Sequence, residues 1–376
     1  MNVSLDNRRL IKILLAFIAW QLILLAVMVM ARMIVLSQSL TAAVAVLDPT
    51  AMHSIWRFWD ADIFQDIAAH GYRFVGSQAD FGFWPLWPIV LRTLTPIFGS
   101  GIVAGIVANQ VFTFLILIIL YRLIRLDHDE PTASRSVWWL MLWPTNFMLT
   151  TLYSDSLFLL LVLLAFYAAR RSNWWWAGIM GGLTAATRHV GALLIFPLAA
   201  AWWSQPRKSW RAFSGSPWWL ALIAVGAAAF PLYGWLTTGR LLVVFDYQRI
   251  GLQHPWSNPL TEAWRYLAAA SHQPWAAAQA GIWLLAGILV TATIVIAIKK
   301  ILPASYAIYS ALLFLFPMFS ASNLIGIPRY SLALWPMYLV LALKLPSRTA
   351  KWVMLGMGLA WLSLTAAWAL AIEVTL

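Results

Sequence analysis

Cysteine is absent from this chain of 376 residues, and charged side chains are scarce. Without cysteine there is no disulfide, no thiolate nucleophile and no cysteine-ligated metal, although the absence says nothing about compartment. Charged residues make up only 10% of the sequence, whereas 62% of it is hydrophobic and 25 residues are tryptophan. A water-soluble domain does not need so much apolar surface, so the composition indicates a protein embedded in a lipid bilayer.

Acidic residues are the scarcer charge, with 13 Asp and Glu against 25 Lys and Arg and a net charge of +12. Such an excess can serve nucleic-acid binding. In a membrane protein it is better explained by positive loops that hold the cytoplasmic side and meet anionic lipids. We therefore expect membrane lipids as partners and no nucleic acid.

Apolar runs recur along the whole chain. A helical span takes about 20 apolar residues, so we expect an all-α polytopic membrane protein with about 11 transmembrane helices, within a range of about 9 to 12. Several runs are short, which predicts tilted helices or half-helices. The runs cover residues 11–36, 102–121, 136–150, 155–169, 174–187, 190–203, 218–237, 277–298, 304–320, 330–343 and 352–372.

The N-terminus, "MNVSLDNRRLIK" followed by the first apolar run, superficially resembles a signal peptide. Its apolar stretch is longer than that of a cleavable signal, and further spans follow, so we expect an uncleaved first span. Cleavage after the small residues of "TAAVA" (41–45) is the alternative.

The distribution of cations orients the spans. With a cytoplasmic N-terminus, alternate loops on that side receive sixteen of the 25 cations, and the outer side receives nine of the 13 acids. Two outer loops exceed hairpin length, 37–101 and 238–276, and both are rich in Trp and Pro. We expect one membrane-embedded domain over 1–376, in which the long first outside loop carries short interfacial helices.

The first outside loop contains "FWDADIFQDIAAHGYRF" (58–74), with three aspartates in seven residues. Read as a helix, it places Asp60 one turn before Phe64, at the head of an apolar stripe that continues through Ile67 and Ala68. A carboxylate at the head of a buried stripe is a candidate general base. The alternative is that Asp60 caps the N-terminus of this helix. Asp62 and Asp66 fall on another face, where they can meet water or pair.

This segment resembles the signature of the PIG-V-like family, which comprises the second mannosyltransferase of GPI-anchor synthesis and its prokaryotic relatives. These are multispanning GT-C-type glycosyltransferases, and the compact chain looks more like the prokaryotic members. The matching residues are Trp59-Asp60, Phe64, Ile67-Ala68 and His70-Gly71-Tyr72, followed by "FGFWPLWPIVLR" (81–92). Further similar stretches follow in order: "PTNFMLTTLYSDSLFLLL" (144–161), "AARRSNWWWAGIMGGLTAATR" (168–188), "YQRIGLQHPW" (247–256) and "GIPRYSLALWP" (326–336).

The resemblance implies an inverting glycosyltransferase. Its donor is expected to be a polyprenyl- or dolichyl-phosphate-linked sugar, usually mannose, and its acceptor a lipid-linked or surface glycan. By the same resemblance the reaction is expected on the outer face of a bacterial or archaeal plasma membrane, without a metal or other cofactor. Such chemistry requires a carboxylate that takes the acceptor proton, for which we select Asp60, and a cation that stabilises the leaving phosphate.

Several further residues are candidates for substrate binding, each with a structural alternative. Asp62 orients the acceptor or is simply solvated. Asp155, in "YSDS", hydrogen-bonds an acceptor, pairs with Arg188 or caps its helix. His70 is a packing or hydrogen-bonding residue in preference to a catalytic acid. For the phosphate we select the outer arginines, whose alternative is anchoring at the membrane interface. The complete set of predicted substrate-binding residues is Asp62, Trp59, His70, Tyr72, Asp155, Arg188, Arg240, Gln248, Arg249 and Arg329, to which the stretch His254-Pro255-Trp256 is added by the resemblance.

Two other classes of function compete with a transferase. A transporter or lipid flippase also carries intramembrane charges and spans broken by Gly or Pro. It should, however, show charges at midspan and paired halves. In this sequence the charges collect at outer span ends and in the two outer loops. A purely structural subunit would not need a carboxylate on an apolar stripe.

Overall fold

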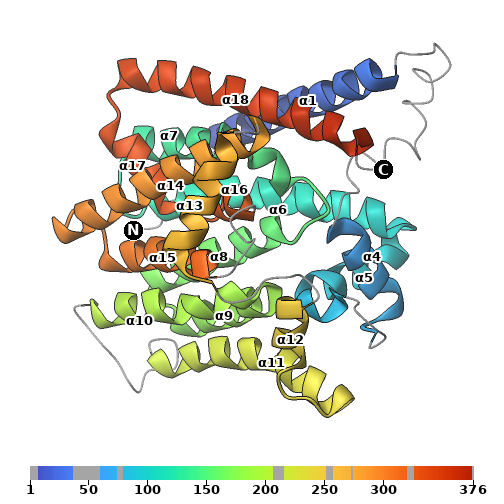
Figure 1. The fold of residues 1–376 in the computed structure, drawn as a ribbon. Helices are drawn as coiled ribbons and strands as arrows, with labels where there is room; N and C mark the ends of the chain where they lie inside the picture. Colours follow the sequence, from blue (N-terminus) through green and yellow to red (C-terminus); the bar gives the residue numbers. More distant parts are fainter. Residues whose placement is uncertain are drawn as a thin grey trace.

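The computed structural model describes residues 7–36, 60–73, 79–205, 216–250, 257–271, 274–319 and 326–374. Within these ranges every regular element is a helix and no β-strand occurs, which confirms the all-α prediction. The helices lie roughly parallel to one another in a bundle, with α1 and α18 side by side along one edge and α11 at the opposite edge (Figure 1).

The α-helices of the first half are α1 (Asn7–Leu36), α4 (Asp60–His70), α5 (Leu86–Phe98), α6 (Gly101–Ile124), α7 (Glu130–Met141), α8 (Asp155–Arg170), α9 (Trp174–Thr187) and α10 (Ile195–Trp203). Those of the second half are α11 (Ala221–Thr238), α12 (Val243–Ile250), α13 (Pro259–Ala270), α14 (Pro274–Ile298), α15 (Ala304–Leu315), α16 (Ile327–Ser331), α17 (Pro336–Lys344) and α18 (Ser347–Val374). The 3₁₀ helices are η1 (Ala79–Gly82), η2 (Asn146–Leu149), η3 (His189–Leu194), η4 (Pro217–Leu220) and η5 (Phe316–Phe319).

Among the described residues, five helical segments are long and apolar enough to cross a bilayer, so the protein is an integral membrane protein. These segments are Arg8–Ala31, Gly101–Ile124, Pro217–Thr238, Ala276–Ile298 and Ser347–Leu370. Shorter apolar helices lie between them, at Leu86–Phe98, His189–Trp203 and Ala304–Phe319. The expected total of about 11 spans stays a prediction.

Prolines break two of the predicted runs. The run 136–150 divides into α7, which ends at Met141, and η2, with Pro144 between them. The run 330–343 divides into α16 and α17, and Pro336 is the first residue of α17. Proline lacks a backbone N–H and clashes with the preceding helical turn, so a continuous helix cannot form there. Both breaks lie near the candidate site.

Helix α8 occupies the centre of the bundle, between α6 and α9. All of its residues are buried except Leu164, Tyr167 and Arg170, as expected for a helix that is hydrophobic all round. Its sixteen residues span about 24 Å at the α-helical rise. This length is below that of a usual span, so α8 is shielded from lipid by its neighbours.

Glycines allow α9 and α11 to approach backbone to backbone. Gly178 and Gly182 on α9, four residues apart, face the carbonyl oxygens of Trp219 and Leu222, and Gly226 on α11 faces the carbonyl oxygen of Gly182. Small residues at this spacing are typical of close helix packing in membranes.

Substitution of Gly182 by Ala is expected to destabilise the protein. The added Cβ would lie 2.6 Å from the Leu222 carbonyl oxygen, so the two helices must separate. Overpacking of this kind typically costs about 1–3 kcal/mol. Thermal inactivation of the detergent-solubilised protein would measure the loss. Gly281→Ala on α14 is the matched control, because nothing lies within 4 Å of its Cβ position. Equal melting of both variants would contradict close packing of α9 on α11.

Charged residues gather at two ends of the bundle, in the grouping that the cation distribution predicts. Ion pairs join Arg9 to Glu130 and Arg170 to Asp127, all residues near loops predicted to be cytoplasmic. Arg135 donates to the carbonyl oxygen of Leu345 in the same region. At the other end lie residues from the predicted outer loops. Which end faces the cytoplasm stays a prediction.

Candidate active site

Asp60 is the first residue of α4, and the apolar stripe predicted to follow it is buried. Phe64, Ile67 and Ala68 pack against Trp87 and Leu91 of α5. The helix ends at His70 and is followed by Gly71, which has a φ of +80° and therefore a left-handed conformation suited to glycine. This packing fixes α4 on the bundle, and Asp60 lies at the N-terminal end of the helix, before the packed residues. The carboxylate of Asp60 is 29% exposed.

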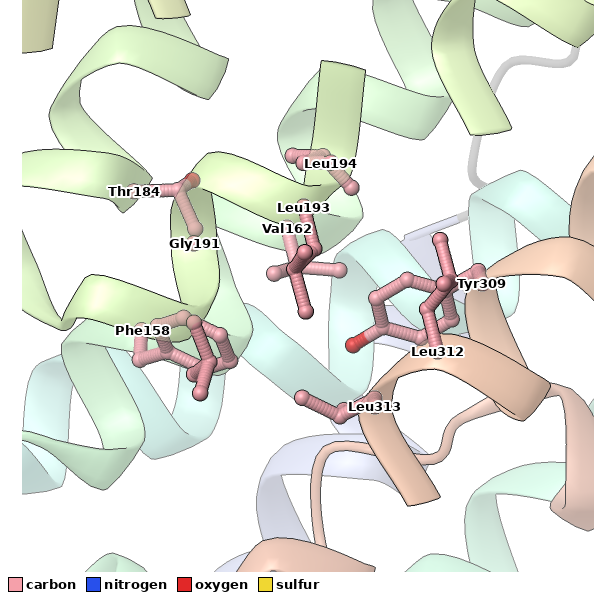
Figure 2. Close-up of a pocket in the computed structure, with 10 residues that line it drawn as sticks. Phe158, Val162, Thr184, Gly191, Leu193, Leu194, Tyr309, Leu312 and Leu313 are labelled. Carbon is pink, nitrogen blue, oxygen red and sulfur yellow. The ribbon is translucent and has the colours of Figure 1, made fainter. Parts of the chain in front are cut away.

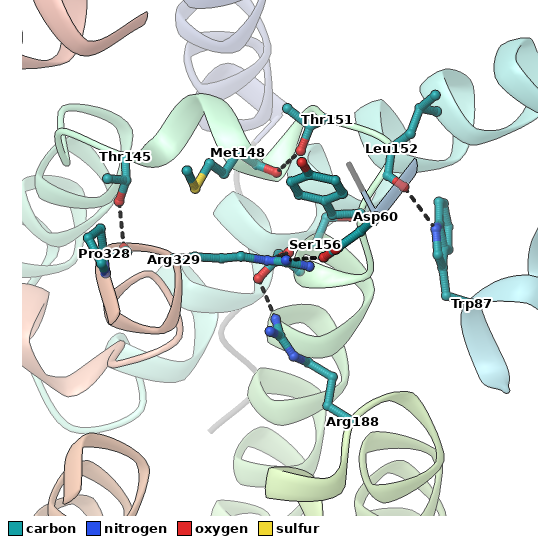
Figure 3. A network of polar contacts seen from close by, with 12 residues as sticks. Asp60, Trp87, Thr145, Met148, Thr151, Leu152, Ser156, Arg188, Pro328 and Arg329 are labelled. Atoms are coloured by element: carbon teal, nitrogen blue, oxygen red, sulfur yellow. Dashed lines mark hydrogen bonds and ion pairs between the residues drawn. The ribbon is translucent and has the colours of Figure 1, made fainter. Parts of the chain in front are cut away.

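Asp60 belongs to a chain of four alternating charges (Figure 3). Nη1 of Arg329 lies 2.5 Å from Oδ2 of Asp60, and Nε of the same arginine lies 2.6 Å from Oδ2 of Asp155. The other oxygen of Asp155 accepts from Nη1 of Arg188. One buried carboxylate therefore holds two arginines, and one of these reaches the partly exposed Asp60. We call these four residues the charged network.

Four elements distant in the sequence contribute to the charged network. Asp155 begins α8, Arg188 follows the last residue of α9, Arg329 lies in the short helix α16, and Asp60 begins α4. The pairing of Asp155 with Arg188, one of the sequence-based alternatives, is confirmed. The bridge that Arg329 makes between Asp60 and Asp155 was not predicted. Asp155 also starts its helix, where the amide dipoles favour a negative charge.

Two tyrosines complete the surroundings of the arginines. The guanidinium carbon of Arg329 lies 4.3 Å from the ring centroid of Tyr153, and that of Arg188 lies 4.8 Å from the ring centroid of Tyr330. These distances are those of cation–π contacts, which help to hold a guanidinium in place. Sequence analysis missed both tyrosines, although each is within two residues of a candidate, in "YSDS" and "IPRY".

Buried hydrogen bonds hold the two loops that carry the network. The loop before α8 is fixed by the Asn109 side chain, which donates to the Tyr153 carbonyl oxygen at 3.2 Å, and by Trp87, which donates to the Leu152 carbonyl oxygen at 3.2 Å. Residues beside Arg329 are fixed in the same way: Thr145 donates to the Pro328 carbonyl oxygen at 2.8 Å, and Trp143 to the Ser331 hydroxyl at 2.9 Å. The arginine and its acidic partners are therefore positioned by the core.

A small apolar cavity lies beside the network, between α8, η3 and α15 (Figure 2). Its volume is about 10 Å³, and its lining includes Phe158, Thr184 and Tyr309. The ring of Phe158 also faces Arg188, at 5.7 Å from its guanidinium carbon. A space of this size holds one water molecule at most and no lipid chain.

The other two acidic residues of α4 are Asp62 and Asp66, and Asp66 has partners outside the charged network. Asp66 pairs with Arg73 and accepts from His70, whose Nδ1 lies 2.8 Å from Oδ1 of the aspartate. This confirms the pairing predicted for Asp66 and the hydrogen-bonding alternative for His70. Asp62 is exposed, on the face opposite to the buried stripe.

Two further candidates lie in other surroundings. Tyr72 donates to the Phe83 carbonyl oxygen at 2.8 Å and packs against Phe81 and Phe230. Burial raises the pKa of its phenol, so Tyr72 remains a neutral donor. Arg240 pairs with Asp246 at 2.7 Å and is 64% exposed. Neither residue contacts the charged network.

Three groups of candidates fall outside what the structure describes. Trp59 and the stretch His254-Pro255-Trp256 lie outside the described ranges. Gln248 and Arg249 belong to α12, but their side chains are not among those described. Over the described residues, no three His, Cys, Asp or Glu side chains gather as a metal site would require.

Comparison with protein families decides the affiliation. The family model described as "Mannosyltransferase (PIG-V)" matches residues 7–205, which is more than half of the chain and includes Asp60, Asp155 and Arg188. The chain belongs to this family of glycosyltransferases. The resemblance to the PIG-V family that the sequence motifs indicate is thereby confirmed. Arg329 lies beyond the matched residues.

Other comparisons add little to the family match. A search of curated proteins gives no match. Among solved structures, the chain is similar to the crystal structure of ArnT from Cupriavidus metallidurans bound to undecaprenyl phosphate. The two chains share 16% sequence identity with a TM-score of 0.49, and the similarity covers 84% of this chain and 70% of the other.

Proposed function

We propose that the protein is an inverting glycosyltransferase that moves a sugar, mannose in the first instance, from a polyprenyl-phosphate carrier to a glycan or glycolipid acceptor. Beyond the family itself, the observation that carries the proposal is the charged network. A partly exposed carboxylate, Asp60, lies against an arginine that the buried Asp155 fixes from the other side. A proton acceptor and a phosphate ligand are therefore adjacent.

The proposed reaction has one step at the sugar. The acceptor hydroxyl oxygen forms a bond to the anomeric carbon while the bond from that carbon to the phosphate oxygen of the donor breaks. The proton of the hydroxyl passes to the Asp60 carboxylate, and the carrier leaves as the lipid phosphate. Attack opposite to the leaving group inverts the anomeric configuration. General-base assistance of this kind contributes about 10²- to 10⁴-fold to a rate.

The arginines supply the charge that the leaving phosphate needs. In the charged network two arginines balance two carboxylates, so no positive charge is in excess. A donor phosphate that contacts Arg329 competes with Asp60 for its guanidinium. Phosphate binding then weakens the ion pair between Arg329 and Asp60, and the Asp60 carboxylate becomes available to the acceptor. Arg329 is suited to this exchange because a guanidinium presents several donors in one plane.

The position of the charges favours a reaction at one membrane face over transport through the bilayer. Asp60 and Asp155 begin their helices, and Arg188 directly follows the end of α9. A translocation pathway would instead place such residues near the middle of spans. With the topology predicted from the cations, the reaction takes place on the outer face of the plasma membrane.

A reconstituted transfer assay tests the proposed function. The purified protein in liposomes would receive radiolabelled polyprenyl-phosphate mannose together with a lipid extract as acceptor source, and the water-insoluble and glycan products would be separated. We expect label to leave the carrier only when the protein is present. Parallel reactions with polyprenyl-phosphate glucose and with a nucleotide-linked mannose identify the donor. Transfer from the nucleotide sugar alone would contradict the proposal.

Transfer is expected to need no divalent cation. The arginines can neutralise the leaving phosphate, a role that Mg²⁺ plays in many phosphate-processing enzymes. Addition of excess EDTA to the transfer assay should leave the initial rate within about twofold of the untreated reaction. A catalytic metal stabilises the transition state by several kcal/mol, so its removal would lower the rate far more than this. A loss of activity that Mg²⁺ or Mn²⁺ restores would show that a metal belongs to the site.

A further inference from the structure

A second hollow lies at the end of the bundle opposite to the charged network, where α1, α6 and α7 meet. Its volume is about 370 Å³, within the range of ligand-binding pockets. Its lining includes Arg9, Lys12, Ala16, Tyr121, Val137 and Trp138. We call it the basal groove. Tyr121 is twelve residues along α6 from Asn109, which supports the site, so the two are about 18 Å apart along the helix axis.

The basal groove is amphipathic along its length. Arg9 and Lys12 lie near the start of α1, at one end of the groove. Farther along α1 the lining is apolar: it consists of Ile13 and Ala16 from α1 together with Val137 and Met141 from α7. Cations at one end and an apolar channel beyond them match a molecule with an anionic head and a hydrocarbon chain.

The two cations are available to an anion. Arg9 pairs with Glu130, but the two side chains are 32% and 38% exposed, and partly exposed ion pairs contribute little stability. Lys12 is exposed, and it makes no ion pair with any other residue that the structure describes. A phosphate group can therefore accept hydrogen bonds from Lys12 and share Arg9 with Glu130.

The position of the groove selects the ligand. Arg9 and Lys12 belong to the first of the cation-rich segments predicted to be cytoplasmic, and the anionic phospholipids of a membrane concentrate in that leaflet. We propose that the basal groove binds an anionic glycerophospholipid, with its phosphate on Arg9 and Lys12 and an acyl chain between α1 and α7. The site is separate from the one that would take the sugar donor, and it does not depend on the proposed reaction.

Native mass spectrometry of the full-length protein tests this proposal. The detergent-purified protein would be titrated with phosphatidylglycerol and, separately, with phosphatidylcholine. We expect the first phosphatidylglycerol to bind roughly 30-fold more tightly than phosphatidylcholine, because each of the two cations near a membrane surface contributes about fivefold. The double variant Arg9→Gln/Lys12→Gln should remove this preference. Ala16→Trp fills the apolar part and keeps both cations, so it should also weaken the first binding event.

The double variant Arg348→Gln/Lys351→Gln is the matched control. These cations are also three residues apart at the start of a long apolar helix, α18, which packs beside α1, but they do not line the groove. We expect it to bind phosphatidylglycerol as the wild type does. If both double variants lose the preference for phosphatidylglycerol equally, the lipid is attracted by the general positive charge of this face and not by the groove, which would overturn the proposal. Wild-type binding by Ala16→Trp, or displacement of the phospholipid by polyprenyl phosphate at lower concentration, would overturn it as well.

Discussion

Asp60→Asn is expected to lower the rate of sugar transfer by about 10²- to 10⁴-fold, which is the contribution of a general base. Asparagine keeps the shape of the side chain but cannot take a proton from the acceptor. Because the loss concerns the chemical step, kcat should fall, while the KM for the donor should not rise, since asparagine competes less than aspartate for Arg329. The transfer assay at several donor concentrations measures both quantities.

The same substitution also breaks the contact of Asp60 with Arg329, so a control must separate the two effects. Asp66→Asn lies on the same helix and also removes an ion pair, that with Arg73, but it is away from the charged network. It should transfer at the wild-type rate. If Asp60→Asn instead raises the donor KM and leaves kcat unchanged, Asp60 positions Arg329 and is not the base. Full activity would move that role to Asp62 or Asp155.

Local patterns in the sequence predicted the helical part of the site well. The spacing of Phe64, Ile67 and Ala68 predicts the buried face of α4, because side chains three and four residues apart share a helix face. Grouping the cations by loop placed Asp155 and Arg188 at the same end of the bundle, and the structure joins them. In the first case the pattern lies within one short helix, and in the second it is the regular alternation of loops between the two sides of the membrane.

The bridge through Arg329 could not be predicted in the same way. Arg329 is 269 residues from Asp60 and 174 from Asp155, and no periodic pattern relates positions so distant. Its placement depends on the helix break before Pro336 and on the hydrogen bond from Thr145 to the carbonyl oxygen of Pro328. Arg240 shows the reverse case. It is a cation in a predicted outer loop, yet a local acidic partner, Asp246, pairs with it.

Asp155→Asn is expected to destabilise the protein and to abolish transfer. The carboxylate is only 4% exposed and accepts from both Arg188 and Arg329, which are themselves 13% and 17% exposed. Asparagine leaves two nearby cations without a shared counter-charge. Removal of one partner from a buried ion pair costs about 3–5 kcal/mol, because the remaining charge stays buried and uncompensated. The midpoint of thermal inactivation in detergent measures the effect, and the transfer assay shows the loss of activity.

A double-mutant cycle shows whether the uncompensated charge is the cause. Arg188→Met removes one of the two cations, so combining it with Asp155→Asn should restore part of the lost stability, and the two changes should not be additive. Transfer should remain absent, because the phosphate ligands are incomplete. Asp127→Asn is the matched control: its pair with Arg170 lies at the opposite end of the bundle, with side chains 28% and 32% exposed, and such pairs contribute about 1 kcal/mol or less. If Asp155→Asn melts as Asp127→Asn does, the two arginines are compensated by other groups, and the shared carboxylate contributes little to stability.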